Sequence, residues 1–172
     1  MVSESDVTND TKSLNRCLDK HLMIVCKQKL GEEYKWLLPQ AVNIGDETMR
    51  QTAERALRQF SANQMDVKFL GNVPSAVYSY RYPEEVTKET QIKGAKIFFF
   101  KANHLSGDFA QNKDFCDDYQ WLNRKELPLV LSKRYWNTIE KSLLVEELDI
   151  NYIMNRNKTF RRIVKKKFSV SQ

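Results

Sequence analysis

The sequence of 172 residues has few of the residues that build cross-linked or metal-held folds, with only 3 Cys and 2 His. Cys17, Cys26 and Cys116 are odd in number and widely spaced, which excludes a disulfide framework or zinc pattern and favours reduced thiols in an intracellular compartment. Two histidines are too few for most histidine-based metal sites. With 5 Gly and 4 Pro, collagen-like and low-complexity classes are also excluded.

Long apolar runs and the common phosphate-binding motifs are missing as well. No uncharged apolar run approaches the roughly 18 residues of a membrane span, so we expect no membrane partner. The sequence contains no Gly-rich dinucleotide fingerprint, no Walker-type phosphate loop and no nucleophile elbow. Residues 1–20 are polar and carry several acids, unlike a signal peptide or an acid-poor presequence.

Charge is what the sequence has in excess, with a formal net charge of +6. The excess lies in the C-terminal region, because the rest of the chain balances 21 basic against 22 acidic residues. This pattern predicts a basic tail, residues 148–172, that binds RNA, while a solvated tail and a membrane-surface helix are the alternatives. The seven predicted RNA-binding residues are Arg156, Lys158, Arg161, Arg162, Lys165, Lys166 and Lys167.

Strands and helices alternate along the rest of the chain, which predicts an α/β (α+β) fold. The spacing of apolar residues and turn signals predicts five strands and two helices. The predicted strands are His21–Lys27 and Tyr34–Leu38, joined as a hairpin, then Val67–Leu70, Val77–Tyr82 and Ala95–Ala102. A long polar loop, Ser106–Gln120, follows them.

The clearest helix is predicted over residues 48–62. Thr48 followed three residues later by Gln51 is typical of a capping box. One apolar stripe at helical spacing is formed by Ala53, Ala56, Leu57 and Phe60. A second helix is expected to begin at Ser132, with Trp136, Ile139 and Leu143 facing inward.

Three further patterns are better explained by structure than by function. Tyr78, Tyr80 and Tyr82 alternate and therefore share one face of a strand, which suits a packing face better than a platform for single-stranded RNA. Residues 93–100 contain consecutive apolar side chains, which predicts a strand covered on both faces. The acids between Asp108 and Asp118 lack the spacing of a metal loop, which favours a solvated loop.

The segment from Leu37 to Asn63 resembles the loop and helix of the Nudix family. Anchoring the family pattern on Glu47 places Arg55 at its arginine and Leu57 at its hydrophobic position. The positions at which that pattern has metal-binding glutamates are Ala56, Gln59 and Phe60. Because Nudix chemistry needs carboxylates there to hold divalent cations, we expect no metal site, no cofactor and no catalysis. Phe60 is expected to be buried and to fill part of the former metal side.

A longer series of segments carries a narrower resemblance, over roughly residues 10 to 145. The segments "WLLPQ", "ETMRQTAERAL", "VKFLGNVPSAVYSYRYP" and "GAKIFFFKA" occur in an order that resembles the degenerate Nudix-like domain of a family of mitochondrial large-subunit ribosomal proteins, the one numbered forty-six. The resemblance implies a mixed β-sheet packed between helices over residues 21–147, after a polar segment, 1–20, and before the basic tail.

The same resemblance implies a structural component of the mitochondrial large ribosomal subunit, located in the mitochondrial matrix. It implies protein partners at the central protuberance, leaves contact with ribosomal RNA open, and implies no small-molecule substrate. Family members carry a presequence, which is not present in this chain. The alternative is an active Nudix-type hydrolase of nucleoside diphosphate derivatives, whose unconventional metal ligands would be Glu47, Glu54 and the Asp114–Asp118 loop.

Overall fold

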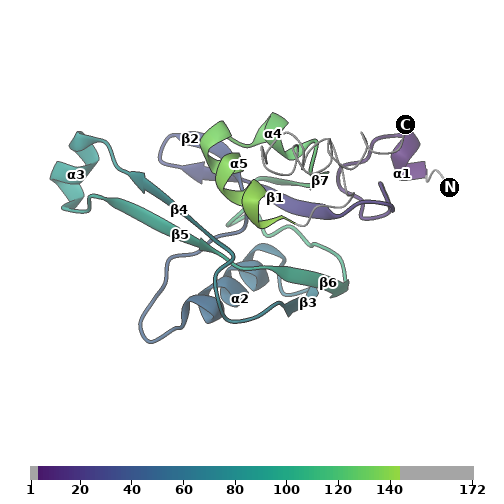
Figure 1. Ribbon diagram of the computed structural model, residues 1–172, viewed down its shortest axis with the longest axis horizontal. Helices are drawn as coiled ribbons and strands as arrows, with labels where there is room; N and C mark the ends of the chain where they lie inside the picture. Colours follow the sequence, from purple (N-terminus) through teal and green to yellow (C-terminus); the bar gives the residue numbers. More distant parts are fainter. Residues whose placement is uncertain (1–3, 144–172) are drawn as a thin grey trace, which may run out of the picture. The chain divides into compact units, whose positions relative to one another are not determined.

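The computed structural model describes residues 4–143, of which residues 4–142 belong to one compact unit (Figure 1). The predicted residues of the basic tail, Arg156 to Lys167, lie outside the described residues. The described strands are β1 (Leu22–Leu30), β2 (Glu33–Leu37), β3 (Asp66–Phe69), β4 (Ala76–Arg81), β5 (Gly94–Phe99), β6 (Ala102–Ser106) and β7 (Asp118–Asn123). The helices are α1 (Glu4–Val7), α2 (Met49–Phe60), α3 (Glu84–Thr90), α4 (Leu127–Val130) and α5 (Lys133–Ile139), followed by the 3-10 turn Glu140–Ser142.

The central sheet has three strands in the order β2-β1-β7, all antiparallel. The hairpin β1–β2 confirms the prediction, with Cys26 opposite Leu37 and Leu30 opposite Glu33. On the other edge of β1, Ile24 lies opposite Trp121 of β7. Strand β7 corrects the prediction that the polar loop runs to Gln120, because the apolar residues of this strand complete the central sheet.

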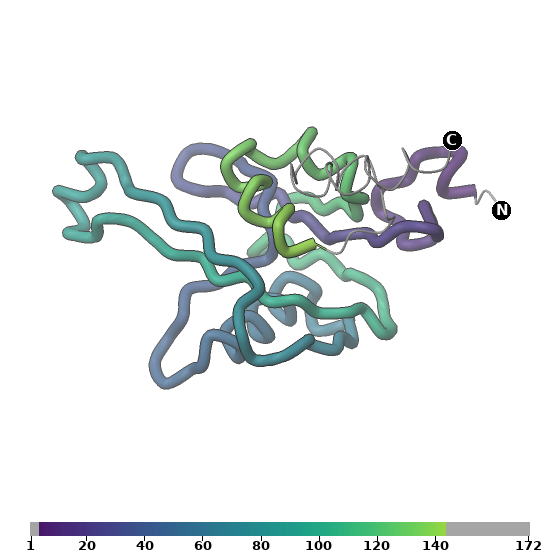
Figure 2. The backbone as a smooth tube through the Cα atoms, in the orientation of Figure 1, coloured from purple at the N-terminus to yellow at the C-terminus, as the bar shows by residue number. Residues whose placement is uncertain are grey.

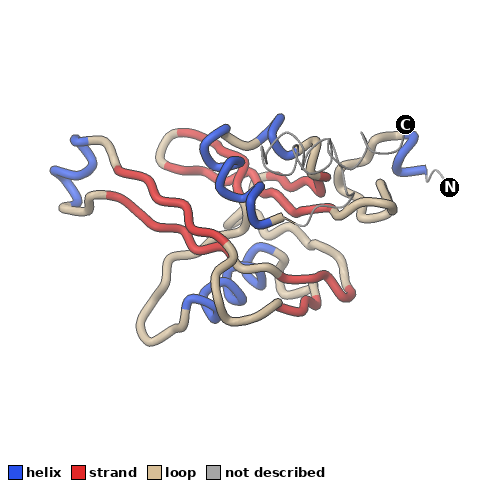
Figure 3. Tube along the Cα trace, in the orientation of Figure 1, coloured by secondary structure: helices blue, strands red, loops and turns tan. Residues whose placement is uncertain are grey.

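Two further sheets have two strands each, β3 with β6 and β4 with β5 (Figure 3). The predicted strand Ala95–Ala102 is therefore two strands, since the chain leaves β4 after Phe99 and pairs with β3 from Ala102. The prediction that residues 93–100 are covered on both faces is also wrong. Phe99 alone is buried, whereas Phe98 is half-buried and Lys96 is exposed.

Helix α2 begins as its sequence predicts. The Thr48 side chain accepts a hydrogen bond from the Gln51 backbone N–H, and the Gln51 side chain accepts one from the Thr48 backbone N–H, which completes the capping box. The buried residues of this helix are Thr52, Ala56 and Phe60, while Ala53 and Leu57 are half-buried. The inward face is thus rotated slightly from the predicted stripe, and it includes a threonine.

The polar N-terminal segment belongs to the same compact unit as the sheet. The Thr11 carbonyl accepts a hydrogen bond of 2.7 Å from the Trp121 backbone N–H on the outer edge of β7. Arg16 is 2% exposed, donates to the Trp121 carbonyl at 2.8 Å and forms an ion pair with Glu126. The polar N-terminal segment therefore contacts the outer edge of β7 at Thr11 and Arg16. Its described part is the purple start of the backbone tube in Figure 2.

The core joins the central sheet to α2 and to the C-terminal helices. One cluster of buried side chains consists of Cys26, Phe60, Phe109, Cys116 and Trp121. On α4 and α5 and directly after α4, the buried residues are Leu127, Leu131, Tyr135 and Ile139. Ser132 precedes α5 as predicted but makes no side-chain cap, and Tyr135 is buried where Trp136 was expected to be.

The predicted combination of helices and strands is confirmed. The single mixed sheet is not, because every strand pair in residues 4–143 is antiparallel and the strands form three sheets. The Nudix character of the fold remains a prediction from the sequence. None of the described helices is long and apolar enough to cross a membrane.

Candidate functional site

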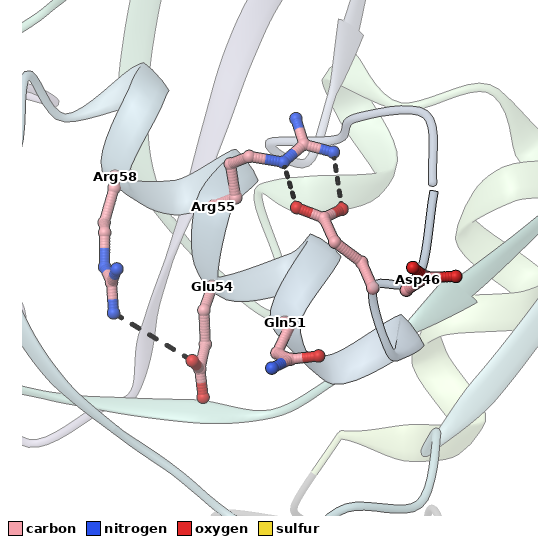
Figure 4. A pocket seen from close by; sticks show the side chains of 6 residues that line it. Asp46, Gln51, Glu54, Arg55 and Arg58 are labelled. Atoms are coloured by element: carbon pink, nitrogen blue, oxygen red, sulfur yellow. Dashed lines mark hydrogen bonds and ion pairs between the residues drawn. The ribbon is translucent and has the colours of Figure 1, made fainter. Parts of the chain in front are cut away.

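The candidate site is the outer face of α2 together with the end of the loop that leads into it. Two opposite charges dominate this face, and the loop brings them together across the first turns of the helix (Figure 4). The face surrounds a shallow depression of about 540 Å³. The depression is lined by Asp46, Glu47, Gln51, Glu54, Arg55 and Arg58.

Glu47 and Arg55 form a two-point ion pair at the centre of the site. Arg55 Nε donates to Glu47 Oε1 at 2.7 Å, and a terminal guanidinium nitrogen donates to Glu47 Oε2 at 2.9 Å (Figure 4). Parallel hydrogen bonds of this kind are stronger and more specific than a single ionic contact. The hydrogen bonds from Arg55 lower the pKa of Glu47, so this carboxylate stays ionised and already has a partner.

The loop before α2 is fixed by the same group of side chains. Asn43 donates to the Glu47 carbonyl at 2.9 Å and to the Thr52 hydroxyl at 2.7 Å. The Thr52 hydroxyl in turn lies 3.1 Å from Glu47 Oε2, and Arg55 donates to the Val42 carbonyl at 2.8 Å. Glu47 therefore has its oxygens occupied by protein donors, and it serves to anchor the loop.

The positions at which the Nudix pattern has metal-binding glutamates carry no charge and mostly face the core. Ala56 and Phe60 are each 2% exposed. Gln59 is half-buried and accepts a hydrogen bond of 3.3 Å from Arg55. The burial predicted for Phe60 is confirmed, and its ring centroid lies 5.8 Å from that of Phe115.

The remaining charges of the face form a second group along α2. Glu54 lies 2.8 Å from Arg50 Nε and 4.0 Å from a guanidinium nitrogen of Arg58. Figure 4 shows the contact between Glu54 and Arg58. Arg50 also donates to the Asn72 side chain at 2.5 Å, which ties the helix to the loop after β3. These pairs have the i,i+4 spacing of neighbours on a helix, and they leave Glu54 with arginine partners on both sides.

The metal ligands that the hydrolase alternative requires do not lie together in one site in the described part of the chain. Within residues 4–143, no three Asp, Glu, His or Cys side chains lie close enough together to hold a metal ion. Of the Asp114–Asp118 loop, Asp118 forms an ion pair with Lys12 and accepts a hydrogen bond from the Tyr119 backbone N–H at 2.9 Å. Asp46 lines the same depression as Glu47 and Glu54, but these three carboxylates of the described part of the chain do not form a metal-holding group.

The tyrosines of β4 lie together, as the alternation predicts. The ring centroids of Tyr78 and Tyr80 are 5.8 Å apart, and those of Tyr80 and Tyr82 are 5.4 Å apart. Tyr78 also packs edge-on against Tyr135 of α5 at 5.3 Å. At the Tyr78 end of β4, the tyrosines therefore form a packing face, which is the interpretation that the sequence favours.

Sequence reasoning missed three residues that organise these sites. Asn43 and Thr52 hold the loop against α2. No residue spacing in the sequence predicts a contact between a loop amide and a helix hydroxyl. Tyr135 could have been found, because Leu131, Tyr135 and Ile139 recur at helical spacing and all three are buried.

Comparison with known proteins identifies a class of relatives, the proteins of the large ribosomal subunit. A protein from Bos taurus named "Large ribosomal subunit protein mL46" is 42% identical over 143 residues, which cover 83% of this chain and 51% of that protein. The protein of the same name from Rattus norvegicus is 39% identical over 142 residues, covering 83% of this chain and 50% of its own length. In Neurospora crassa the identity is 35% over 145 residues, with 80% and 39% covered.

These similarities confirm the resemblance to the mL46 family that the sequence predicted. The chain spans about half the length of the animal relatives it matches. No model of a protein family matches the chain.

Proposed function

We propose that this chain is a structural, non-catalytic constituent of the mitochondrial large ribosomal subunit. The observation that carries the proposal is the similarity to mL46 proteins over 80–83% of the chain in animals and in a fungus. Proteins of that name belong to the large ribosomal subunit. The location that follows for this chain is the mitochondrial matrix, on the ribosome.

The chemistry of the α2 face supports a scaffold rather than an enzyme. Its central carboxylate, Glu47, is neutralised by Arg55 at 2.7 and 2.9 Å and holds the loop in place. A Nudix enzyme would instead use ionised carboxylates from this helix to bind divalent cations against a diphosphate. Arg55 also donates to the Val42 carbonyl and so links Glu47 to the loop, which supports a structural role for this carboxylate.

The proposed partners are proteins of the central protuberance of the large subunit, with ribosomal RNA as a further contact. The basic residues from Arg156 to Lys167 suit phosphate contacts, because they carry seven positive charges without an acid. No small-molecule substrate and no cofactor are part of this proposal.

Sedimentation of the protein with mitochondrial ribosomes tests the proposal directly. The protein, tagged at its chromosomal locus, should migrate with the large-subunit ribosomal RNA when a mitochondrial lysate is separated on a sucrose gradient. After chelation of Mg²⁺ it should remain with the large subunit and leave the position of intact ribosomes. A protein that stays at the top of the gradient under both conditions would refute the proposal.

A further inference from the structure

The β4–β5 hairpin is a part of the described unit that does not belong to the candidate site on α2. Strands β4 and β5 pair through six residues, from Ala76 opposite Phe99 to Arg81 opposite Gly94, and α3 forms the tip. Gly94 allows this close pairing, because a Cβ there would overlap the carbonyl oxygen of Tyr80. Figure 1 shows the hairpin extending away from the other described elements.

The base of the hairpin is supported by α5. Tyr135 of α5, which is 2% exposed, packs against Tyr78 at 5.3 Å and Phe99 at 5.5 Å. Farther along the strand, Tyr80 and Tyr82 are half-buried, and their ring centroids lie 5.4 Å apart. A two-stranded ribbon is marginally stable in water unless something covers one face, so the open part of this face is suited to a partner.

The two faces of the hairpin differ in character. Alternation places Tyr78, Tyr80 and Tyr82 on one face, which we call the tyrosine face. Ser79 and its partner Lys96 lie on the opposite face. The tyrosine face also holds Ala95 opposite Tyr80 and Ile97 opposite Tyr78, so its open surface is aromatic and apolar.

The charged residues of β4, β5 and α5 are all positive. Residues 70–82 and 92–101 contain Arg81, Lys93, Lys96 and Lys101 and no acid, and α5 adds Lys133 and Arg134. None of these six cations forms an ion pair with a residue of the described part of the chain. The acids of the hairpin, Glu84, Glu85 and Glu89, are confined to α3 at the tip.

Two of these cations flank the row of tyrosines. Arg134 lies over the Tyr78 ring, 5.7 Å from its centroid, and donates to the Ser79 carbonyl at 3.0 Å. At the other end, the Tyr82 backbone N–H donates to the Lys93 carbonyl at 3.1 Å, which places Lys93 across from Tyr82. The row of rings thus has an exposed positive charge at each end.

We propose that the tyrosine face binds a single-stranded segment of RNA, with bases on Tyr80 and Tyr82 and phosphates on Lys93 and Arg134. Aromatic side chains beside a track of cations are the surface that unpaired RNA needs, because every base has a face that stacks and every linkage has a charge. An acidic protein segment would match the cations but would leave the half-buried rings without flat partners. Burial, together with the Tyr82 hydroxyl, raises the pKa of Tyr80 to about 12, so the ring is neutral beside phosphate.

This inference rests on the proposed function for the source of the RNA, but binding can be measured on the purified 172-residue chain. The probe is a short fluorescein-labelled oligouridine, followed by anisotropy at salt concentrations from about 50 to 200 mM. Tyr82→Leu should weaken binding roughly 5-fold to 100-fold, the effect of losing one stacked base, without changing the salt dependence. Lys93→Gln combined with Arg134→Gln should reduce the slope of log K against log salt by about 1.4, because two phosphates no longer meet a cation.

The matched control changes the same charge on the same hairpin. Arg81→Gln combined with Lys96→Gln removes two exposed cations from the opposite face and should leave the slope close to that of the wild type. Ultraviolet cross-linking to oligouridine, mapped by mass spectrometry, should label the peptide that contains Tyr80 and Tyr82. All substituted side chains except Tyr82 are exposed, so circular dichroism should show an unchanged fold.

Three outcomes would overturn the inference. One is wild-type affinity and slope in both the Tyr82→Leu and the Lys93→Gln/Arg134→Gln proteins, and another is an equal loss in the opposite-face control. The third is unchanged RNA binding combined with loss of the same variants from the large subunit on sucrose gradients, which would assign the face to a protein partner. In that last case the proposed function would stand, whereas RNA binding by a protein that never sediments with ribosomes would refute the function alone.

Discussion

Replacing Phe60 by glutamate tests whether the face of α2 that resembles a metal site is a closed core. Phe60 is 2% exposed and packs in a cluster with Cys26, Phe109, Cys116 and Trp121. Deleting a buried phenylalanine side chain costs about 3–5 kcal/mol, and a glutamate adds a buried charge without a partner. We therefore expect Phe60→Glu to lower the free energy of unfolding by at least about 3 kcal/mol at neutral pH.

The pH dependence gives this prediction a second, independent readout. Burial would raise the folded-state pKa of the new glutamate above its unfolded value of about 4.3. The folded variant then binds the proton more tightly than the unfolded chain, so its stability falls as pH rises from about 4.3 through the folded pKa. The loss relative to the wild type should be larger at pH 7 than at acid pH.

Urea unfolding followed by circular dichroism and tryptophan fluorescence measures both effects, since Trp121 lies in the same cluster. The matched control is Gln59→Glu, one residue earlier, which places a carboxylate beside Arg55 at the surface of the helix. That change should alter stability by less than about 1 kcal/mol, as is usual for a surface ion pair. If Phe60→Glu unfolds at the urea concentration of the wild type, the cluster is open to solvent and the structural argument for a closed face fails.

Three further predictions concern catalysis, the N-terminal segment and the tail. The purified chain should hydrolyse no nucleoside diphosphate derivative with Mg²⁺ or Mn²⁺, and a turnover that Glu47→Gln abolishes would establish the hydrolase instead. Desolvation raises the pKa of Glu126, but hydrogen bonds from Arg16 and from the Asn123 backbone outweigh it and lower the pKa overall. Glu126→Gln should therefore cost roughly 1–3 kcal/mol in urea unfolding at neutral pH and progressively less as pH falls through the lowered pKa; a constant cost across pH would exclude the charge as the cause. Truncation after Asn155 should weaken RNA binding and reduce the salt slope by roughly 0.7–0.9 for each phosphate that the tail neutralises, whereas an unchanged slope would exclude the tail as an RNA-binding element.

Much of the local structure could be predicted from the sequence. Thr48 and Gln51 specify the start of α2 through contacts only three residues apart, and the structure contains both. The first hairpin and the shared face of Tyr78 and Tyr80 follow from a turn signal and a period of two. Burial of Phe60 was predictable because the 3.6-residue period fixes which side chains share the inner face of a helix.

Other features depended on partners far along the chain. Strand β7 pairs with β1, about a hundred residues earlier, and its residues show no alternation that distinguishes a strand from a loop. The division of the predicted strand Ala95–Ala102 into β5 and β6 is a choice between two partner strands, β4 and β3, which apolar residues alone do not specify.

For the functional surfaces, the sequence determined which groups are present and the tertiary structure decided how they are used. The sequence alone showed that the α2 positions of a Nudix metal site carry no carboxylate, because Ala56, Gln59 and Phe60 cannot supply one. Only the folded loop brought Glu47 within 2.7 Å of Arg55 and made it an anchor, since hydrogen bonds depend on positions that the loop path sets. Likewise, the fold placed Arg134 beside the tyrosine row, because packing of α5 against β4 joins residues 55 positions apart.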